Sequence, residues 1–255
     1  MLARAELNCV RHGRGPEVFV GLHGWSGSHR SFEPLWDRVP ESASFYSFDL
    51  PGFGASPDPA RWDIDGFLEP LESELNAWEG PPMTLVGACG GAVVALFLAL
   101  RMGPKVNRLV MIDPFANVPW YFRIFRVPVI GPLLYALVFM NPAGRILTNW
   151  GLRSRRTDDT DLIEGFRDVR HASNLAYLGV LLACAEVEFS SFGRFRGQVD
   201  IVYGSRTFGA VRSSVPRWRS VWPALSAHEL AGAGHLPIFE ATDGVAEVVF
   251  GDRAA

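Results

Sequence analysis

A cysteine in a glycine-rich turn is the residue of this chain best placed to do chemistry. The segment Gly87-Ala88-Cys89-Gly90-Gly91 stands between a short apolar run, 83–86, and a longer one, 92–100. In a sharp turn from strand to helix the central residue is strained and its side chain projects above the sheet, while small neighbours allow close approach of backbone. The spacing predicts that Cys89 is a nucleophile on such a turn.

The helix predicted over 92–100 would help to activate this thiol. Unpaired N–H groups and the helix dipole at its N-terminus favour the thiolate, which is the reactive form of cysteine. The alternative is a small buried Cys89 that only packs in the turn, since buried free cysteines are common. Because strand, turn, glycines and helix agree, we favour the nucleophile.

The elements that must position Cys89 belong to an α/β fold. Short apolar runs alternate with longer helical patterns, as in a largely parallel sheet with crossover helices. The helix over 92–100 is apolar all round and is therefore predicted to be buried. A final helix is predicted over 238–249, and 12–16 is predicted to be the turn of a hairpin. The predicted strands are 7–11, 18–22, 44–48, 83–86, 108–112, 199–203 and 227–230.

Between Asp113 and about Phe195 the pattern becomes helical and aromatic-rich, without a good central strand. We therefore expect a core made of residues 1–114 and 196–255, interrupted by a helical cap or lid at 115–195. The apolar early part of the cap would line a pocket and favour an acyl or aromatic substrate, although most of its side chains would simply pack the cap onto the core.

Composition limits the class of protein. With 255 residues and 48% hydrophobic content, the chain can bury one large core. A formal net charge of −3 and scattered Lys and Arg argue against a nucleic-acid partner. Cys9, Cys89 and Cys184 are too widely spaced for a disulfide framework or a metal site, and Glu6 falls where a secretory signal needs its apolar centre. We expect a cytoplasmic protein.

Two further segments stand out in the sequence. The stretch 127–140 is very apolar, but it is broken by Pro128 and Pro132 and falls short of the roughly 20 residues that span a bilayer. We therefore expect no membrane span. An apolar helix on the surface is the alternative for this stretch. A charged run at 153–161 would recognise a polar substrate group or a carrier protein, or would be solvated and self-paired, which we favour. Its members are Arg153, Arg155, Arg156, Asp158, Asp159 and Asp161.

Taken in order, several motifs resemble those of the α/β-hydrolase superfamily over nearly the whole chain. They are His23-Gly24-Trp25-Ser26-Gly27-Ser28, Asp49-Leu50-Pro51-Gly52-Phe53-Gly54-Ala55-Ser56, the turn around Cys89, Leu109-Val110-Met111-Ile112-Asp113-Pro114 and Gly232-Ala233-Gly234-His235. The resemblance implies the α/β-hydrolase fold, with a mostly parallel central sheet flanked by helices and an inserted helical cap. Serine is the usual nucleophile of the family, and cysteine takes its place in dienelactone-hydrolase-like enzymes and certain thioesterases.

The resemblance also implies the partners of Cys89. His235 has the chain order and the small-residue loop of the general base, and the alternative is a loop histidine with no role. The N–H groups of Trp25 and Gly90 are expected to form the oxyanion hole. His23 is expected to support its loop rather than to transfer protons.

The acid of the triad departs from the family pattern. After the strand at 199–203 the expected carboxylate position holds Thr207, and no Asp or Glu follows before Glu229. Asp113 is the best substitute, because haloalkane-dehalogenase-like members place their acid after the matching strand. The alternative is that Asp113 only caps a turn; Asp49 is expected to hold its own loop. A thiol, with a pKa of about 8.5 against about 6.5 for histidine, tolerates a weakened triad better than a hydroxyl does.

These residues predict a hydrolase that cleaves an ester or thioester bond through a Cys89 acyl-enzyme, with His235 as general base and Asp113 as acid. No metal or organic cofactor is implied. The expected partner is a small apolar acyl ester or thioester, with an acyl carrier as a further candidate. The alternatives are an acyltransferase or carrier-linked thioesterase, a hydrolase-fold protein that binds a ligand without catalysis, and a redox-sensitive thiol at Cys89.

Overall fold

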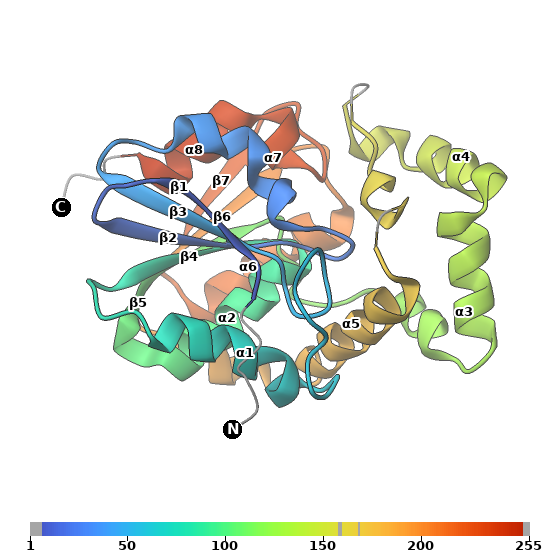
Figure 1. Ribbon diagram of the computed structural model, residues 1–255. Helices are drawn as coiled ribbons and strands as arrows, with labels where there is room; N and C mark the ends of the chain where they lie inside the picture. The colour runs from blue at the N-terminus through green and yellow to red at the C-terminus, as the bar shows by residue number, and fades with distance from the viewer. Residues whose placement is uncertain (1–6, 158–159, 168, 252–255) are drawn as a thin grey trace.

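A seven-stranded sheet forms the centre of the part of the chain that the computed structural model describes, residues 7–157, 160–167 and 169–251 (Figure 1). The strand order is β1-β3-β2-β4-β5-β6-β7, and β1 alone runs antiparallel to its neighbour among the described strands. The mostly parallel sheet predicted from the sequence is confirmed. The strands are β1 (Cys9–Gly13), β2 (Glu17–Leu22), β3 (Ala43–Phe48), β4 (Met83–Ala88), β5 (Val106–Ile112), β6 (Gln198–Gly204) and β7 (Ser226–Leu230).

The predicted hairpin between the first two strands is wrong. Strand β3 lies between β1 and β2 and pairs with both of them. The short link crosses the start of β3, where the Gly15 N–H donates to the carbonyl of Ala43 at 2.9 Å. A Cβ at Gly15 would lie 1.9 Å from the backbone of Ser42, so only glycine permits this crossing.

Helices cover both faces of the sheet because successive strand residues point to opposite sides. On β4, Leu85 packs with the helices of one face and Val86 with those of the other. The first face carries α1 (Ile64–Asn76), α2 (Gly90–Met102), α5 (His171–Cys184) and α6 (Gly209–Val221), and the second carries the 3₁₀ helix η1 (His29–Arg38), α7 (Pro237–Glu240) and α8 (Thr242–Phe250) (Figure 1).

The final helix was predicted as one piece, and this is wrong. The chain breaks between α7 and α8 at Ala241, whose φ of −148° and ψ of 50° are not helical. The Glu240 side chain just before the break accepts hydrogen bonds from the N–H groups of Thr157 and Gly234. The break therefore keeps α7 as a short separate helix directly after the loop that carries His235.

The regular elements of the insertion between β5 and β6 are all helices within its described residues. It contains η3 (Trp120–Arg126), α3 (Ile130–Tyr135), the π-helical turn η4 (Ala136–Met140), α4 (Pro142–Gly151), η5 (Arg153–Arg155), η6 (Glu164–Arg167), α5 and η7 (Phe189–Arg194); η2 (Gly103–Lys105) precedes β5. Its first part has its own apolar cluster around Tyr135, Phe139 and Phe166, whereas α5 and η7 pack into the main core.

In the described residues no single helix combines the length and the hydropathy that crossing a membrane requires. The helices Trp120–Arg126 and Ile130–Met140 reach this length and hydropathy only when they are taken together, and the chain bends by 110° between them.

Candidate active site

Cys89 occupies the turn between β4 and α2, in the strained geometry predicted for it. Its φ of 50° and ψ of −114° are unusual for a side chain other than glycine, and its N–H donates to the carbonyl of Ile112 at 2.8 Å. A Cβ at Gly91 would lie 2.1 Å from the carbonyl oxygen of Leu22, and one at Gly87 would lie 2.4 Å from Cα of Ala92. The two glycines thus let the turn close against β2 and α2.

The loop after β2 lies against this turn. A Cβ at Gly24 would be 3.0 Å from the Cβ of Cys89, so the backbone next to Trp25 runs beside the thiol. Gly90 is the first residue of α2, where N–H groups have no acceptor within the helix. Both predicted oxyanion donors therefore belong to backbone segments that border Cys89.

The structure brings His235 and Asp113 together. Nδ1 of His235 is 2.7 Å from Oδ2 of Asp113, and the Gly204 N–H donates to Oδ1 of the same carboxylate at 3.2 Å. Asp113 is 1% exposed, at the end of β5, with a positive φ of 50° like that of Cys89. Its carboxylate contacts His235, the histidine that the sequence singled out. Asp113 therefore does more than cap a turn, which was the alternative role.

Thr207 joins this pair, although the sequence suggested no role for it. Its hydroxyl donates to Oδ2 of Asp113 and lies 3.3 Å from Nδ1 of His235. Thr207 stands where the family pattern expects the acid, and the Asp113 carboxylate reaches the same place from the neighbouring strand. The only sequence signal was the missing carboxylate after β6.

His235 is held in the charged form by its neighbours. Burial alone would lower its pKa, but hydrogen bonds to Asp113 and Cys89, together with their charges, raise the pKa of His235 from 6.5 to about 10. The imidazole is also enclosed by the rings of Phe115 and Phe208, at 5.7 and 4.7 Å between centroids. At neutral pH this histidine therefore carries a proton between the Asp113 carboxylate and the sulfur of Cys89.

His23 and Asp49 have structural contacts, as expected. His23 is fully buried, hydrogen-bonds the Gly24 carbonyl through Nδ1 and accepts the Leu50 N–H through Nε2 at 3.0 Å. Burial lowers the pKa of His23 to about 4, so it stays neutral. The buried Asp49 carboxylate accepts hydrogen bonds from Asn8, His29 and Ala55.

Helix α5 supplies two buried polar residues that sequence reasoning missed. Oδ1 of Asn174 accepts the Ser26 N–H at 3.1 Å, and Nδ2 of Asn174 donates to the hydroxyl of Tyr135 at 2.7 Å. The indole N–H of Trp25 donates to the Asn174 carbonyl at 2.9 Å. Asn174 thereby ties the loop beside Cys89 to the insertion. Polar residues inside an otherwise apolar helical pattern were the available signal.

Tyr177, one turn further along α5, is also fully buried, and its hydroxyl has no hydrogen-bond partner among the described residues. A Cβ at Gly90 would lie 3.3 Å from this hydroxyl, which places it close to the Cys89 turn. Burial and the nearby Cys89 and Cys184 raise the pKa of Tyr177 well above its usual range.

Burial acts strongly on the other two cysteines. Burial raises the pKa of both Cys9 and Cys184 to about 12, with Glu74 adding to the effect at Cys9. All three cysteines are free. Within the described ranges, no three His, Cys, Asp or Glu side chains are grouped so that they could hold a metal ion.

The charged run at 153–161 contacts the loops that carry Thr207 and His235. The Arg155 carbonyl accepts the His235 N–H at 2.8 Å, and the Arg155 guanidinium donates to the Thr207 carbonyl at 3.0 Å. Asp161 accepts the Ile163 N–H. Asp158 and Asp159 lie outside the described residues.

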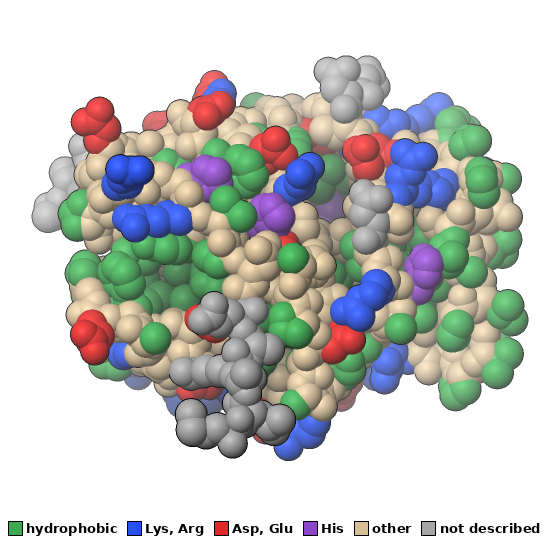
Figure 2. All heavy atoms as spheres, viewed as in Figure 1, with side chains coloured by type: hydrophobic (Ala, Val, Ile, Leu, Met, Phe, Trp, Pro, Cys, Tyr) green, Lys and Arg blue, Asp and Glu red, His purple; other side chains and the backbone are tan. Residues whose placement is uncertain are grey.

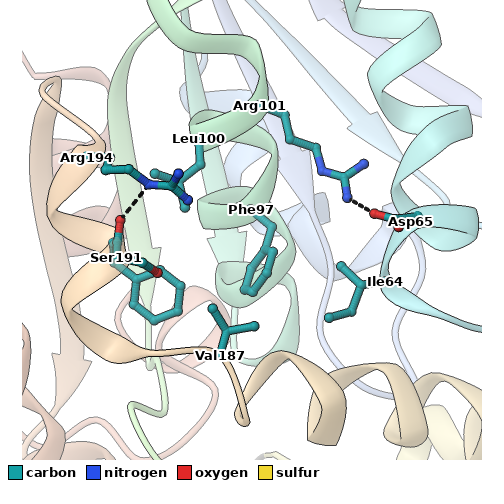
Figure 3. A pocket seen from close by; sticks show the side chains of 9 residues that line it. Ile64, Asp65, Phe97, Leu100, Arg101, Val187, Ser191 and Arg194 are labelled. Carbon is teal, nitrogen blue, oxygen red and sulfur yellow. Dashed lines mark hydrogen bonds and ion pairs between the residues drawn. The ribbon is translucent and has the colours of Figure 1, made fainter.

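A surface groove lies away from this site (Figure 3). It is bordered by Ile64 and Asp65 of α1, the C-terminal half of α2 and η7, and Arg101 spans it to reach Asp65. Phe97 and Leu100 in its wall lie two to three turns along α2 from Cys89, so the groove takes no part in the arrangement around the thiol.

Comparison with known protein families shows to which family this chain belongs. The sequence model of the Alpha/beta hydrolase family matches residues 18–248. This chain belongs to that family. The resemblance seen in the motifs is confirmed, and the family name covers both the core and the insertion.

Relatives within the family match over shorter stretches. A pimeloyl-[acyl-carrier protein] methyl ester esterase of Neisseria meningitidis is 30% identical over 96 residues, which are 38% of this chain and 36% of that protein. Lipase LipV of Mycobacterium tuberculosis is 33% identical over 110 residues, 43% of this chain and 42% of the lipase. The chain thus spans well under half the length of either relative.

Solved structures of the same hydrolase fold match nearly end to end. A bromoperoxidase from Bacillus anthracis superposes with a TM-score of 0.74 at 18% identity, over 95% of this chain and 93% of that one. Epoxide hydrolase VrEH1 from Vigna radiata gives a TM-score of 0.74 at 16% identity, over 98% of both chains. At such identities the likeness shows the fold alone.

Proposed function

We propose that this α/β-hydrolase cleaves an ester or thioester by forming an acyl-enzyme on Cys89. The observation that carries the proposal is a thiol at the strained β4–α2 turn in contact with His235, which is in turn bound to the buried Asp113. Nucleophile, base and orienting acid in contact are the arrangement that acyl transfer requires.

The chemistry follows from the protonation of His235. The thiolate Sγ of Cys89, paired with the protonated His235, attacks the substrate carbonyl carbon, and the Trp25 and Gly90 N–H groups donate to the oxygen that becomes negative. Protonated His235, whose pKa is raised to about 10, gives its proton to the leaving alcohol or thiol as the carbonyl–heteroatom bond breaks. Water then attacks the thioester and loses a proton to the neutral imidazole. The sulfur leaves as a thiolate, which releases the acid and restores the pair of Cys89 thiolate and protonated His235.

The insertion acts in this proposal as the cap over the acyl pocket. Trp25 contacts five aromatic rings of the insertion, at centroid distances of 4.9 to 6.3 Å; they belong to Phe122, Phe125, Tyr135, Phe139 and Phe166. Such a wall beside the thiol favours an apolar acyl chain. The names of the esterase and lipase relatives support an ester substrate, and that of the former suggests a carrier-bound acyl group.

Intact-mass spectrometry after brief incubation with p-nitrophenyl esters and acyl thioesters tests the proposal. Wild type and the control Cys9→Ala should show a transient acyl adduct on Cys89 together with turnover, while Cys89→Ala shows neither. His235→Ala should lose turnover by roughly 100-fold or more. No adduct and no turnover in folded protein would overturn the proposal, and product formed on an added alcohol or thiol rather than on water would change it to acyl transfer.

A further inference from the structure

The outer side of the insertion exposes several large apolar side chains. We call it the cap face. Eight side chains define it, each 45 to 73% exposed; they are Val129, Ile130, Leu133, Leu137, Met140, Ile146, Leu147 and Trp150. Val129 directly precedes α3, and the others lie on α3, η4 and α4, at the right-hand end of the view in Figure 1, where Figure 2 shows hydrophobic side chains spread over the surface.

The segment that carries most of the cap face is apolar on every side. Residues 130–140 contain no charged side chain, and their inner side buries Tyr135 and Phe139 in the insertion's own cluster. A helix that is apolar all round is normally covered on all sides. Here the chain covers one side only, and the exposed apolar area exceeds what isolated surface residues account for.

The segment that carries the cap face is rich in arginine. Residues 114–157 contain six arginines and no Asp, Glu or Lys, in a chain whose formal net charge is −3. Arg145 lies on α4 beside Ile146, and the guanidinium of Arg153 lies 5.1 Å from the ring centre of Trp150. Arg123 is paired with Glu186 at 2.5 Å, so its charge is already balanced.

We propose that the cap face docks on a membrane surface that contains anionic lipids. Exposed Leu, Ile and Trp side chains enter the boundary between headgroups and acyl chains, while Arg145 and Arg153 attract lipid phosphate. A second copy of the chain would bring like charges together, and an acidic carrier protein would leave much of the apolar area uncovered. The surface that carries the arginines and the apolar residues together fits a bilayer best.

Docking through the cap face would place the insertion directly on the bilayer surface. The inner side of the same helices contacts Trp25, whose loop borders Cys89. An apolar molecule that leaves the bilayer would thus meet the insertion first. The docking itself does not depend on the proposed acyl chemistry and is measured without substrate.

Co-sedimentation with vesicles tests the proposal. Purified wild type should partition onto vesicles of 70% phosphatidylcholine and 30% phosphatidylglycerol, and much less onto pure phosphatidylcholine. Arg145→Gln with Arg153→Gln should weaken partitioning by roughly 25-fold at low salt, at about fivefold for each charge. Leu147→Ser with Trp150→Ser should weaken it by on the order of tenfold or more.

Matched controls lie on other surfaces of the core. Arg14→Gln, in the exposed turn before β2, and Phe239→Ser, on α7, should leave partitioning unchanged. Wild type that stays in the supernatant with both vesicles would overturn the proposal, as would equal losses in the controls. A concentration-dependent dimer, or binding to an acidic acyl carrier, that the cap-face variants abolish without any vesicle binding would replace the bilayer with that partner.

Discussion

Replacing Asp113 by Asn tests the ion pair at the centre of the site. The change keeps the shape of the side chain but removes the charge beside Nδ1 of His235 at 2.7 Å. The hydrogen bond to Asp113 is the largest of the contacts that raise the pKa of His235. In Asp113→Asn the pKa of His235 should therefore fall by several units, since burial opposes the charge of the imidazole.

The effect on stability follows from proton linkage. A group whose pKa rises from 6.5 to about 10 on folding stabilises the folded state fully below pH 6.5 and loses this contribution as the pH rises through about 10. Between pH 8 and pH 10 the wild type should accordingly lose about 2 kcal/mol of unfolding free energy from this group. Asp113→Asn should be less stable at pH 8 by about 2 kcal/mol and should show little of this slope.

Urea unfolding at several pH values between 7 and 10, with NMR titration of the His235 ring, measures both effects. Asp49→Asn is the matched control, because Asp49 is also a buried carboxylate bound to histidine, in the loop beside His29. It should lower stability and keep the slope of the wild type. A wild-type stability that does not fall between pH 8 and 10, or an equal slope in Asp113→Asn, would refute the reasoning.

The remaining predictions concern the neighbours of the thiol. Gly91→Ala should cost about 3 kcal/mol of unfolding free energy, since its Cβ would meet the Leu22 carbonyl at 2.1 Å. Gly209→Ala is the control, because a Cβ there has no atom within 4 Å, and it should be neutral or slightly stabilising. Thermal melts of both variants and the wild type measure the difference. Asn174→Leu should cost about 2 kcal/mol and also lower kcat, because it leaves the Ser26 N–H and the Tyr135 hydroxyl without their partner. Tyr177→Phe should leave the unfolding free energy unchanged or raise it by about 1 kcal/mol, and a clear loss in chemical denaturation would show that the hydroxyl has a partner in solution.

Local patterns in the sequence predicted what depends on local structure. Short apolar runs located every strand of the described sheet within a few residues, and the glycines around Cys89 predicted the strained turn. The β1–β2 hairpin was wrong because β3, nearly thirty residues later, takes the place between the two strands. Such pairing depends on contacts that no short pattern contains.

The side chains that surround the site show the same limit. The sequence left Asp113 between two roles, and only the fold shows its carboxylate beside His235 and Thr207. Asn174 and Tyr177 lie in an apolar helical pattern that predicts burial but not what a buried polar group will face. Ser26 beside Asn174 and Gly90 beside Tyr177 are each more than eighty residues away along the chain, and only folding makes them neighbours.

The position of Trp25 makes entry to the site and readiness for reaction mutually dependent. Its ring is held by the aromatic side chains of the insertion and its indole N–H by the Asn174 carbonyl, while its backbone borders Cys89. If the insertion moved outward to admit a bulky molecule, the Trp25 side chain would move with it. The backbone N–H of Trp25, which is proposed as oxyanion donor, would then be displaced. An open enzyme would then be a slow one, and full activity would return only when the insertion closes over the bound molecule, which would protect the thiol from unproductive encounters with solvent.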